Sequence, residues 1–177
     1  NLEDIKAPEC FIVERLCRER MNIPVFHDDQ HGTAIVVGAA ALNSLRLVGK
    51  RFDDIKLVST GGGAAGIACL NMLVTLGVKR ENIYLCDLHG LVHEGRNEDM
   101  TPEKAAFAQP GTLRGLGDVI GGADLFLGLS GPNVLTAEMV TGMAEKPIVF
   151  ALANPTPEID PAAVRAARPD AIVATGR

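Results

Sequence analysis

The chain has 177 residues, of which 47% are apolar and 22% charged, a composition typical of a globular domain that excludes a disordered polypeptide. Its net charge of −5 argues against nucleic acid or an anionic membrane as a partner, because both require a basic surface. Aromatic residues make up only 4%, so the core must consist mainly of aliphatic side chains, as in a buried parallel sheet.

The apolar runs are short and interrupted by glycine, so the sequence predicts no membrane span, and no secretory signal is visible. Four cysteines lie in apolar surroundings without metal-site spacing, and we expect buried, reduced thiols and a cytoplasmic location; they are Cys10, Cys17, Cys69 and Cys86. The chain begins at Asn1 and ends at Arg177 without a closing helix, so we expect a piece of a longer protein; a processed or partly ordered chain would look the same.

The first 50 residues are predicted to be mostly helical. Charged and apolar residues alternate at helical spacing over 7–21, which indicates an amphipathic helix. Residues 23–26 are expected to be extended, because Pro24 disfavours helix at the residue before it. Residues 32–48 are apolar almost all round and predict a buried helix, with Gly49 at its C-cap.

From residue 56 onward, short strands alternate with helices. The predicted strands are 56–60, 82–87, 124–128, 147–152 and 171–174, and the predicted helices are 64–76, 112–120, 136–143, 161–167 and a short one that opens at Thr101 with Pro102 at its first position. Residues 88–100 are expected to form a loop. This alternation predicts an α/β fold with a doubly wound, Rossmann-like parallel sheet over 51–177, preceded by a helical lead-in over 1–50.

A glycine-rich turn joins the first strand to its helix. Its sequence is Gly61-Gly62-Gly63-Ala64-Ala65-Gly66, a G-x-G-x-x-G pattern in the strand–turn–helix setting that dinucleotide binding requires. Gly61 permits the tight turn, Gly63 lets the backbone approach a pyrophosphate, and Gly66 allows close packing of helix on strand. The helix N-terminus supplies free N–H groups for phosphate. These six residues are the predicted phosphate site.

An acidic residue ends the next strand. Asp87 lies 21 residues after Gly66, where such folds place a carboxylate that accepts hydrogen bonds from the adenine ribose. A turn or N-cap aspartate is the alternative. Asp87 favours NAD because it repels a 2′-phosphate, but His89 or Arg96 would meet that phosphate if the loop folds back. The choice between NAD and NADP stays open.

Three other stretches carry acids at the ends of elements: Glu3-Asp4, Asp28-Asp29 and the run from Asn154 to Glu158. Clustered carboxylates suit a hard divalent cation with oxygen ligands. Each pair alone is more often a pair of solvated acids or a helix N-cap.

Taken together, these motifs resemble malic enzyme of the bacterial type. The resemblance covers essentially the whole chain, in order, and rests on five stretches: Asn1-Leu-Glu-Asp-Ile5, Pro24-Val-Phe-His-Asp-Asp-Gln-His-Gly-Thr-Ala34, the glycine turn with Ile67-Ala68, Phe126-Leu-Gly-Leu-Ser130, and Ala151-Leu-Ala-Asn-Pro-Thr-Pro-Glu158.

The resemblance implies roles for particular residues. Mg²⁺ or Mn²⁺ would be bound by Glu3, Asp4 and Asp29, with Asp28 orienting the ligands. The cofactor would contact Thr33 at a helix N-terminus and Ser130 and Gly131 on the nicotinamide side, and Asn154 would contact cofactor or substrate. For His27 and His31 the resemblance leaves structural hydrogen bonding as the expected role.

The implied reaction is the oxidative decarboxylation of (S)-malate to pyruvate and CO₂ with reduction of NAD(P)⁺. The family's proton-transferring Lys and Tyr belong upstream of Asn1, so no catalytic residue is expected within the chain, and Tyr84, inside a predicted strand, is expected to be structural. We therefore expect the isolated chain to bind dinucleotide weakly and to turn over no malate, and the full-length protein to be a homo-oligomer.

Two alternatives remain from the residues. One is another Rossmann dehydrogenase, of the glutamate or tetrahydrofolate type, which does not need the acids at Glu3, Asp4 and Asp29. The other is a nucleotide-binding or interaction module without catalysis, which would not need an intact glycine turn together with those acids.

Overall fold

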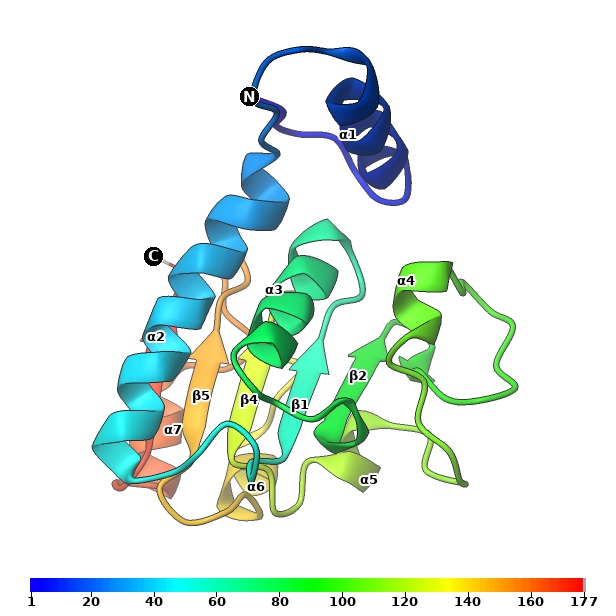
Figure 1. Ribbon diagram of the computed structural model, residues 1–177. Coiled ribbons are helices and arrows are strands. Elements are labelled where there is room, and N and C mark those ends of the chain that lie inside the picture. The colour runs from blue at the N-terminus through cyan, green and yellow to red at the C-terminus, as the bar shows by residue number, and fades with distance from the viewer. Residues whose placement is uncertain (177) are drawn as a thin grey trace.

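The strands form a sheet of order β3-β2-β1-β4-β5-β6 in the computed structural model, which describes residues 1–176 (Figure 1). The strands are β1 Leu57–Thr60, β2 Ile83–Asp87, β3 Gly90–Leu91, β4 Leu125–Gly128, β5 Ile148–Ala151 and β6 Ile172–Thr175. The helices are α1 Glu9–Arg20, α2 Thr33–Val48, α3 Ala64–Thr75, α4 Pro102–Ala105, α5 Leu116–Val119, α6 Ala137–Thr141 and α7 Pro161–Ala167, with a π-helix η1 Asp28–Gly32 and a 3₁₀ turn η2 Arg80–Asn82.

The sheet winds outward in both directions from β1. Strand β1 pairs in parallel with β2 on one side and with β4 on the other, so that Thr60 stands between Cys86 and Gly128. Chain order therefore reverses next to β1, and a doubly wound sheet binds its ligand in the crevice at that switch point, beyond the carboxyl ends of the strands.

Alternate residues of each strand enter two separate cores. Leu57 and Leu125 pack against α2 and α3 on one face, and their neighbours Val58 and Phe126 pack against α5, α6 and α7 on the other. The strands are buried on both faces, which explains why they read as continuous apolar runs. The predicted doubly wound α/β fold is confirmed, and Figure 1 shows the sheet between the two helical layers.

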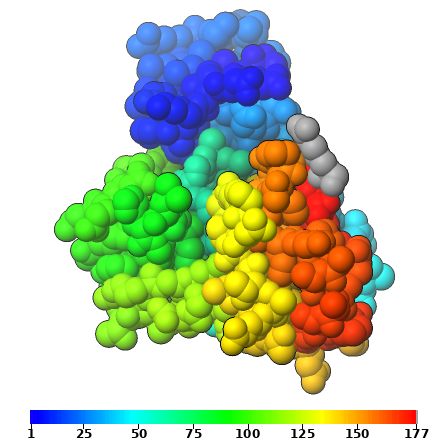
Figure 2. All heavy atoms as spheres, turned by 180° about the vertical axis from the view of Figure 1, so that it is seen from behind, coloured from blue at the N-terminus to red at the C-terminus, as the bar shows by residue number. Residues whose placement is uncertain are grey.

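The first 32 residues stand above the carboxyl edge of the sheet. Figure 2 shows this segment, in blue, as a separate mass on one end of the molecule. Its two ends are joined by main-chain bonds: the Leu2 N–H donates to Phe26 O at 2.7 Å, and the Asp28 N–H donates to Leu2 O at 2.9 Å. Helix α1 is attached to η1 through Glu14, which accepts hydrogen bonds from Gln30 and lies 2.6 Å from His31 Nε2.

Helix α2 continues from η1 without a break and ends where the sequence predicted. Gly49 adopts a left-handed φ of 74° as its C-cap. The stretch Asp28–Val48 is long and apolar enough to cross a membrane by length and composition, although a third of it is buried inside the molecule. Because Val37 and Leu45 lie in the core beneath it, we assign α2 to the helical layer of the α/β fold.

Some predicted elements differ from the structure. The helix predicted over 112–120 is only the four-residue α5, because two glycines interrupt its apolar pattern. Residues 88–100, predicted as a loop, contain the short strand β3, which pairs antiparallel with β2. Gly90 makes this reversal possible with a φ of 90°.

Of the predicted buried thiols, Cys10, Cys69 and Cys86 are buried and Cys17 is half-buried. Burial raises the pKa of Cys69 and Cys86 to about 12, so these thiols stay protonated at neutral pH.

Candidate functional site

The glycine turn lies at the switch point and is held by close main-chain contacts. A Cβ on Gly66 would stand 1.9 Å from Gly61 O, and one on Gly61 would stand 2.3 Å from Leu129 O. Gly61 also has a φ of 103°, which L side chains rarely adopt. Helix α3 begins at Ala64, inside this motif, with Gly63 as its N-cap, so that its first N–H groups lie at the turn.

Gly63 differs from its neighbours because a Cβ there would meet no atom within 4 Å. Its φ of −82° is open to any residue. The fold therefore does not require glycine at position 63, whereas close approach of a pyrophosphate does.

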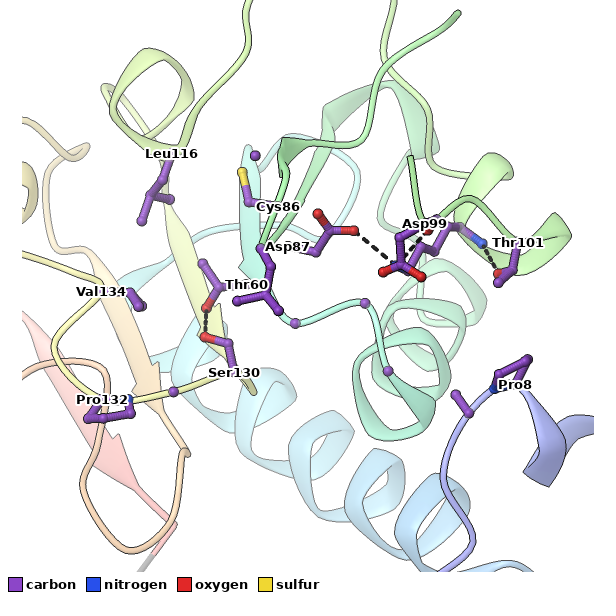
Figure 3. A pocket seen from close by; sticks show the side chains of 18 of the residues that line it. Pro8, Thr60, Cys86, Asp87, Asp99, Thr101, Leu116, Ser130, Pro132 and Val134 are labelled. Atoms are coloured by element: carbon purple, nitrogen blue, oxygen red, sulfur yellow. Dashed lines mark hydrogen bonds and ion pairs between the residues drawn. The ribbon is translucent and has the colours of Figure 1, made fainter. Parts of the chain in front are cut away.

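A cavity of about 710 Å³ opens above the turn (Figure 3). The turn residues Gly61 to Gly63 form its floor, Asp87 lies on one side, and Ser130 and Gly131 lie on the other. Residues of the lead-in, Ala7, Pro8 and Phe11, also line it. The volume is in the range of a small-molecule or cofactor site.

Of the predicted cofactor residues, Gly61, Gly62, Gly63, Asp87, Ser130 and Gly131 line this cavity, whereas Thr33, Ala64, Ala65, Gly66 and Asn154 do not appear in its lining. Gly66 instead packs α3 on the turn, as its spacing indicated. Thr33 is the first residue of α2, and Asn154 is exposed beyond the end of β5.

Asp87 is held by two cations. Its Oδ1 accepts the His89 N–H at 2.9 Å, and its Oδ2 accepts Lys104 Nζ at 3.0 Å and the Arg96 guanidinium. Burial acts to raise the pKa of Asp87, but the hydrogen bonds from Arg96 and Lys104 outweigh it and hold the pKa below its usual value. The loop after Asp87 folds back, which is the condition under which His89 or Arg96 was expected to meet a 2′-phosphate. It brings the Arg96 guanidinium, rather than the His89 ring, to the Asp87 carboxylate.

Lys104 is the site residue that the sequence reasoning missed. It lies in α4, packs its stem beneath Gly62, where a Cβ would meet Lys104 Cε at 2.7 Å, and binds Asp99 as well as Asp87. Its side chain is only 6% exposed. It lies 17 positions after Asp87, and no known motif predicts a lysine at that spacing. The N-cap of α4 was visible in the sequence, and Thr101 Oγ1 does accept the Lys104 N–H at 3.3 Å.

The opposite wall follows β4. Ser130 Oγ lies 2.9 Å from Thr60 Oγ1, so the ends of β1 and β4 are joined by hydroxyls at the floor of the cavity (Figure 3). The Ser130 N–H donates to the buried carboxylate of Glu158 at 2.9 Å. Pro132 and Val134 continue this wall outward.

The predicted metal-binding acids come from two segments that lie side by side. The Asp4 N–H donates to Asp29 Oδ2 at 2.8 Å, and His27 Nε2 lies 3.8 Å from the same oxygen. Glu3 is exposed, and its Oε2 accepts a hydrogen bond from the Asn1 amide at 3.4 Å. Within residues 1–176, no group of three His, Cys, Asp or Glu side chains is arranged to hold a metal ion, so these acids do not by themselves form a coordination shell.

His27 and Asp28 lie beside these acids. The His27 ring is fully buried, and neither ring nitrogen has a hydrogen-bond partner in the described part of the chain. Asp28 occupies the space beside Gly32, where a Cβ would meet Asp28 Oδ1 at 2.5 Å. By contrast, His31 lies within hydrogen-bond distance of Glu14.

The glycine turn at the switch point, the acid after β2 and the cavity between them define a dinucleotide-binding domain of the Rossmann type. The family model described as malic enzyme, NAD binding domain matches residues 30–177. The chain belongs to this family, which confirms the resemblance to malic enzyme. The match argues against the alternative of a glutamate- or tetrahydrofolate-type dehydrogenase.

Similar proteins include both cofactor classes. The chain is 62% identical over 177 residues to the NAD-dependent malic enzyme of Rhizobium meliloti, of which it covers 23%, and 58% identical over 178 residues to the NADP-dependent malic enzyme of Escherichia coli, of which it covers 24%. Each alignment includes the whole of this chain, which thus spans about a quarter of these relatives. The NAD-dependent malic enzyme of Thermotoga maritima aligns over all of this chain and 48% of its own, with a TM-score of 0.91 and 46% identity.

Proposed function

We propose that this chain is the dinucleotide-binding part of a malic enzyme, which converts (S)-malate to pyruvate and CO₂ while reducing NAD⁺ or NADP⁺. The observation that carries the proposal is the glycine turn Gly61–Gly66 at the switch point of the sheet, in a chain of the malic enzyme NAD-binding family. A site for the hydride acceptor is what an oxidoreductase of this class requires.

When bound, the nicotinamide cofactor accepts a hydride from C2 of malate. The residues of this chain hold and orient it. The turn and the N-terminus of α3 bind the pyrophosphate, the cluster around Asp87 faces the adenine ribose, and the wall at Ser130 and Gly131 bounds the nicotinamide side. The side chains of Phe11 and Pro8, both from the lead-in, border the cavity and limit the access of water.

We retain Mg²⁺ or Mn²⁺ at Glu3, Asp4 and Asp29, with Asp28 beside them, as part of the proposal. Its support is the pairing of the two acidic segments through Leu2 and His27. The test is a Mn²⁺ titration of the full-length protein and its Asp29→Asn variant, with Asp54→Asn as the control at an exposed acid on the far edge of the sheet. Unchanged Mn²⁺ affinity in Asp29→Asn would contradict this assignment.

The proton-transferring Lys and Tyr are proposed to lie outside residues 1–177. Within the described part of the chain, the tyrosine that is present, Tyr84, lies in β2 with Lys56 Nζ 5.0 Å above its ring, which agrees with a structural role. We expect residues 1–177 alone to form no NAD(P)H from malate, and measurable formation would refute this division of labour.

The overall activity is tested with the full-length protein, malate, Mn²⁺ and either NAD⁺ or NADP⁺. Absorbance at the reduced nicotinamide band is followed together with pyruvate. We expect malate-dependent reduction of the cofactor with pyruvate in equal amount. Dinucleotide binding without any malate-dependent reduction would instead support a nucleotide-binding module without catalysis.

We also propose that the full-length protein is a cytoplasmic homo-oligomer that binds neither nucleic acid nor membrane. The acidic net charge supports the absence of nucleic-acid and membrane binding. Analytical ultracentrifugation at several concentrations tests the oligomeric state, and a sedimentation coefficient of a monomer at micromolar protein would contradict it.

A further inference from the structure

We propose that Glu158 is a positioning residue for the nicotinamide end of the dinucleotide site. It acts through the loop that begins at Ser130 and does not itself touch the cofactor. This inference rests on the proposed function and goes beyond it, because it assigns a role to a side chain that does not line the cavity.

The Glu158 carboxylate is fully buried and uses both of its oxygens. Oε1 accepts the Ser130 N–H at 2.9 Å and lies 3.4 Å from Ser130 Oγ, while Oε2 accepts the Ala153 N–H at 3.0 Å. Ser130 follows β4 and Ala153 follows β5, so one carboxylate joins the carboxyl ends of two neighbouring strands.

The sheet leaves space for this carboxylate at Gly128. A Cβ on Gly128 would stand 2.3 Å from Glu158 Cδ and less than 3 Å from both carboxylate oxygens. The last residue of β4 is therefore a glycine whose missing side chain is replaced by the Glu158 head group.

The main chain around Glu158 holds the rest of the loop. The Asn133 N–H donates to Pro157 O at 3.2 Å, and the Leu135 N–H donates to Glu158 O at 3.1 Å. Together with the bond at Ser130, the loop 130–135 is fixed to residues 157–158 at its start, middle and end. These bonds hold the loop in one conformation.

This loop is the cavity wall on the nicotinamide side. Ser130, Pro132 and Val134 stand on one side of the cavity in Figure 3, with Asp99 and Thr101 on the other. A dinucleotide that crosses the switch point places its adenosine toward β2 and its nicotinamide toward β4. The effect of Glu158 is therefore confined to the nicotinamide half.

Both oxygens must accept, so a glutamine cannot replace the glutamate. In Glu158→Gln, the side-chain NH₂ faces the N–H of Ser130 in one orientation and the N–H of Ala153 in the other. Either orientation sets two donors against each other and leaves a buried amide without an acceptor, which is costly. Because the two side chains have nearly the same shape, the change is electrostatic rather than steric.

The experiment compares two probes on the full-length protein by calorimetry. NADH or NADPH, whichever the wild type binds, reports on the whole site, and ADP-ribose reports on the half that lacks nicotinamide. We expect Glu158→Gln to weaken binding of the dinucleotide by up to about tenfold, because the free energy of one lost buried hydrogen bond bounds the cost of restoring the loop when the cofactor binds, and to leave ADP-ribose affinity within about twofold. The control is Asp124→Asn, a carboxylate that accepts the Lys56 N–H at 2.8 Å at the opposite edge of the sheet, for which both affinities should stay the same.

An equal loss for both probes, or no loss for either, overturns the positioning role. If Glu158→Gln does not fold, Glu158→Asp keeps a carboxylate but shortens it by one methylene, so that it cannot reach the N–H groups of both Ser130 and Ala153; a smaller loss confined to the dinucleotide supports the role, and unchanged binding overturns it. Failure of the wild type to bind either probe would instead overturn the proposed function.

Discussion

Lys104 Nζ lies 3.0 Å from Asp87 Oδ2, and both side chains are almost fully buried. Arg96 binds the same oxygen, so the carboxylate expected to repel a 2′-phosphate carries two positive partners. The sequence indicated a negative charge at the ribose end of the cavity. In the structure, Arg96 and Lys104 compensate the charge of Asp87 there.

Lys104→Met tests what this compensation does. Removing one cation leaves Asp87 with Arg96 alone, so the site becomes less favourable to a 2′-phosphate. Hydrogen bonds to charged groups contribute about 1.5–3 kcal/mol, so we expect NADPH affinity to fall roughly 10- to 100-fold relative to NADH. Fluorescence titration of both cofactors measures the ratio, with the exposed Lys79→Met as control. An unchanged ratio would remove Lys104 from cofactor selection.

Two alanine substitutions in the glycine turn should have different effects. Gly66→Ala places a Cβ against main-chain oxygen, so we expect a loss of about 1–3 kcal/mol in the free energy of unfolding. Gly63→Ala meets no neighbour, so its stability should change by less than about 0.5 kcal/mol while dinucleotide affinity falls. Urea unfolding and cofactor titration separate the two. Normal binding by Gly63→Ala would show that the pyrophosphate does not approach this residue.

Glu14 attaches helix α1 to η1 within the lead-in. Its side chain is 9% exposed, and Glu14→Ala leaves the Gln30 amide and the His31 ring without their partner. We expect faster amide exchange across α1 and η1, with no change in β1 or β4. Arg15→Ala, on the exposed face of the same helix, is the control. Uniformly faster exchange throughout the chain would mean that Glu14 stabilises the whole fold.

Asp170 gives a prediction about pH. The Arg168 guanidinium and the Lys146 N–H hold the pKa of this carboxyl below its usual range. The unfolded chain therefore binds more protons than the folded chain in acid, so the contribution of Asp170 is complete above the unfolded pKa of about 3.9 and is lost as pH falls below it. Asp170→Asn should lower Tm at pH 7, and its difference from wild type should shrink below about pH 4. The exposed Glu81→Gln serves as control; a constant difference across this range would contradict the linkage.

The strand–helix alternation could be predicted because its signals are local. The glycine turn, the C-cap at Gly49 and the N-cap at Thr101 each specify backbone geometry within a few residues. Strand β3 could not, because a two-residue strand has too short a pattern to be distinguished from a loop, and it forms only by pairing with Cys86 and Asp87.

The candidate site could likewise be predicted only where its signals are local. Residues fixed by the turn motif were found, whereas Lys104 and Glu158 act through contacts between segments far apart in the chain. Glu158 ends the motif Asn154–Glu158, but the motif indicates no role for it, because nothing in the sequence shows that its two oxygens meet N–H groups after two different strands. The contact of Asp4 with Asp29 likewise depends on tertiary geometry.

The continuity of η1 and α2 has a mechanical consequence. Asp28 and Asp29 occupy the first turn of a helical rod whose later turns share a core with α3, and α3 starts at the phosphate turn. A displacement of the acids relative to the phosphate turn would require two packed helices to slide past each other, which a close-packed core resists. Any change in the width of the cavity would therefore have to come from parts that lie outside this pair of helices, such as α1, which is attached to η1 through Glu14.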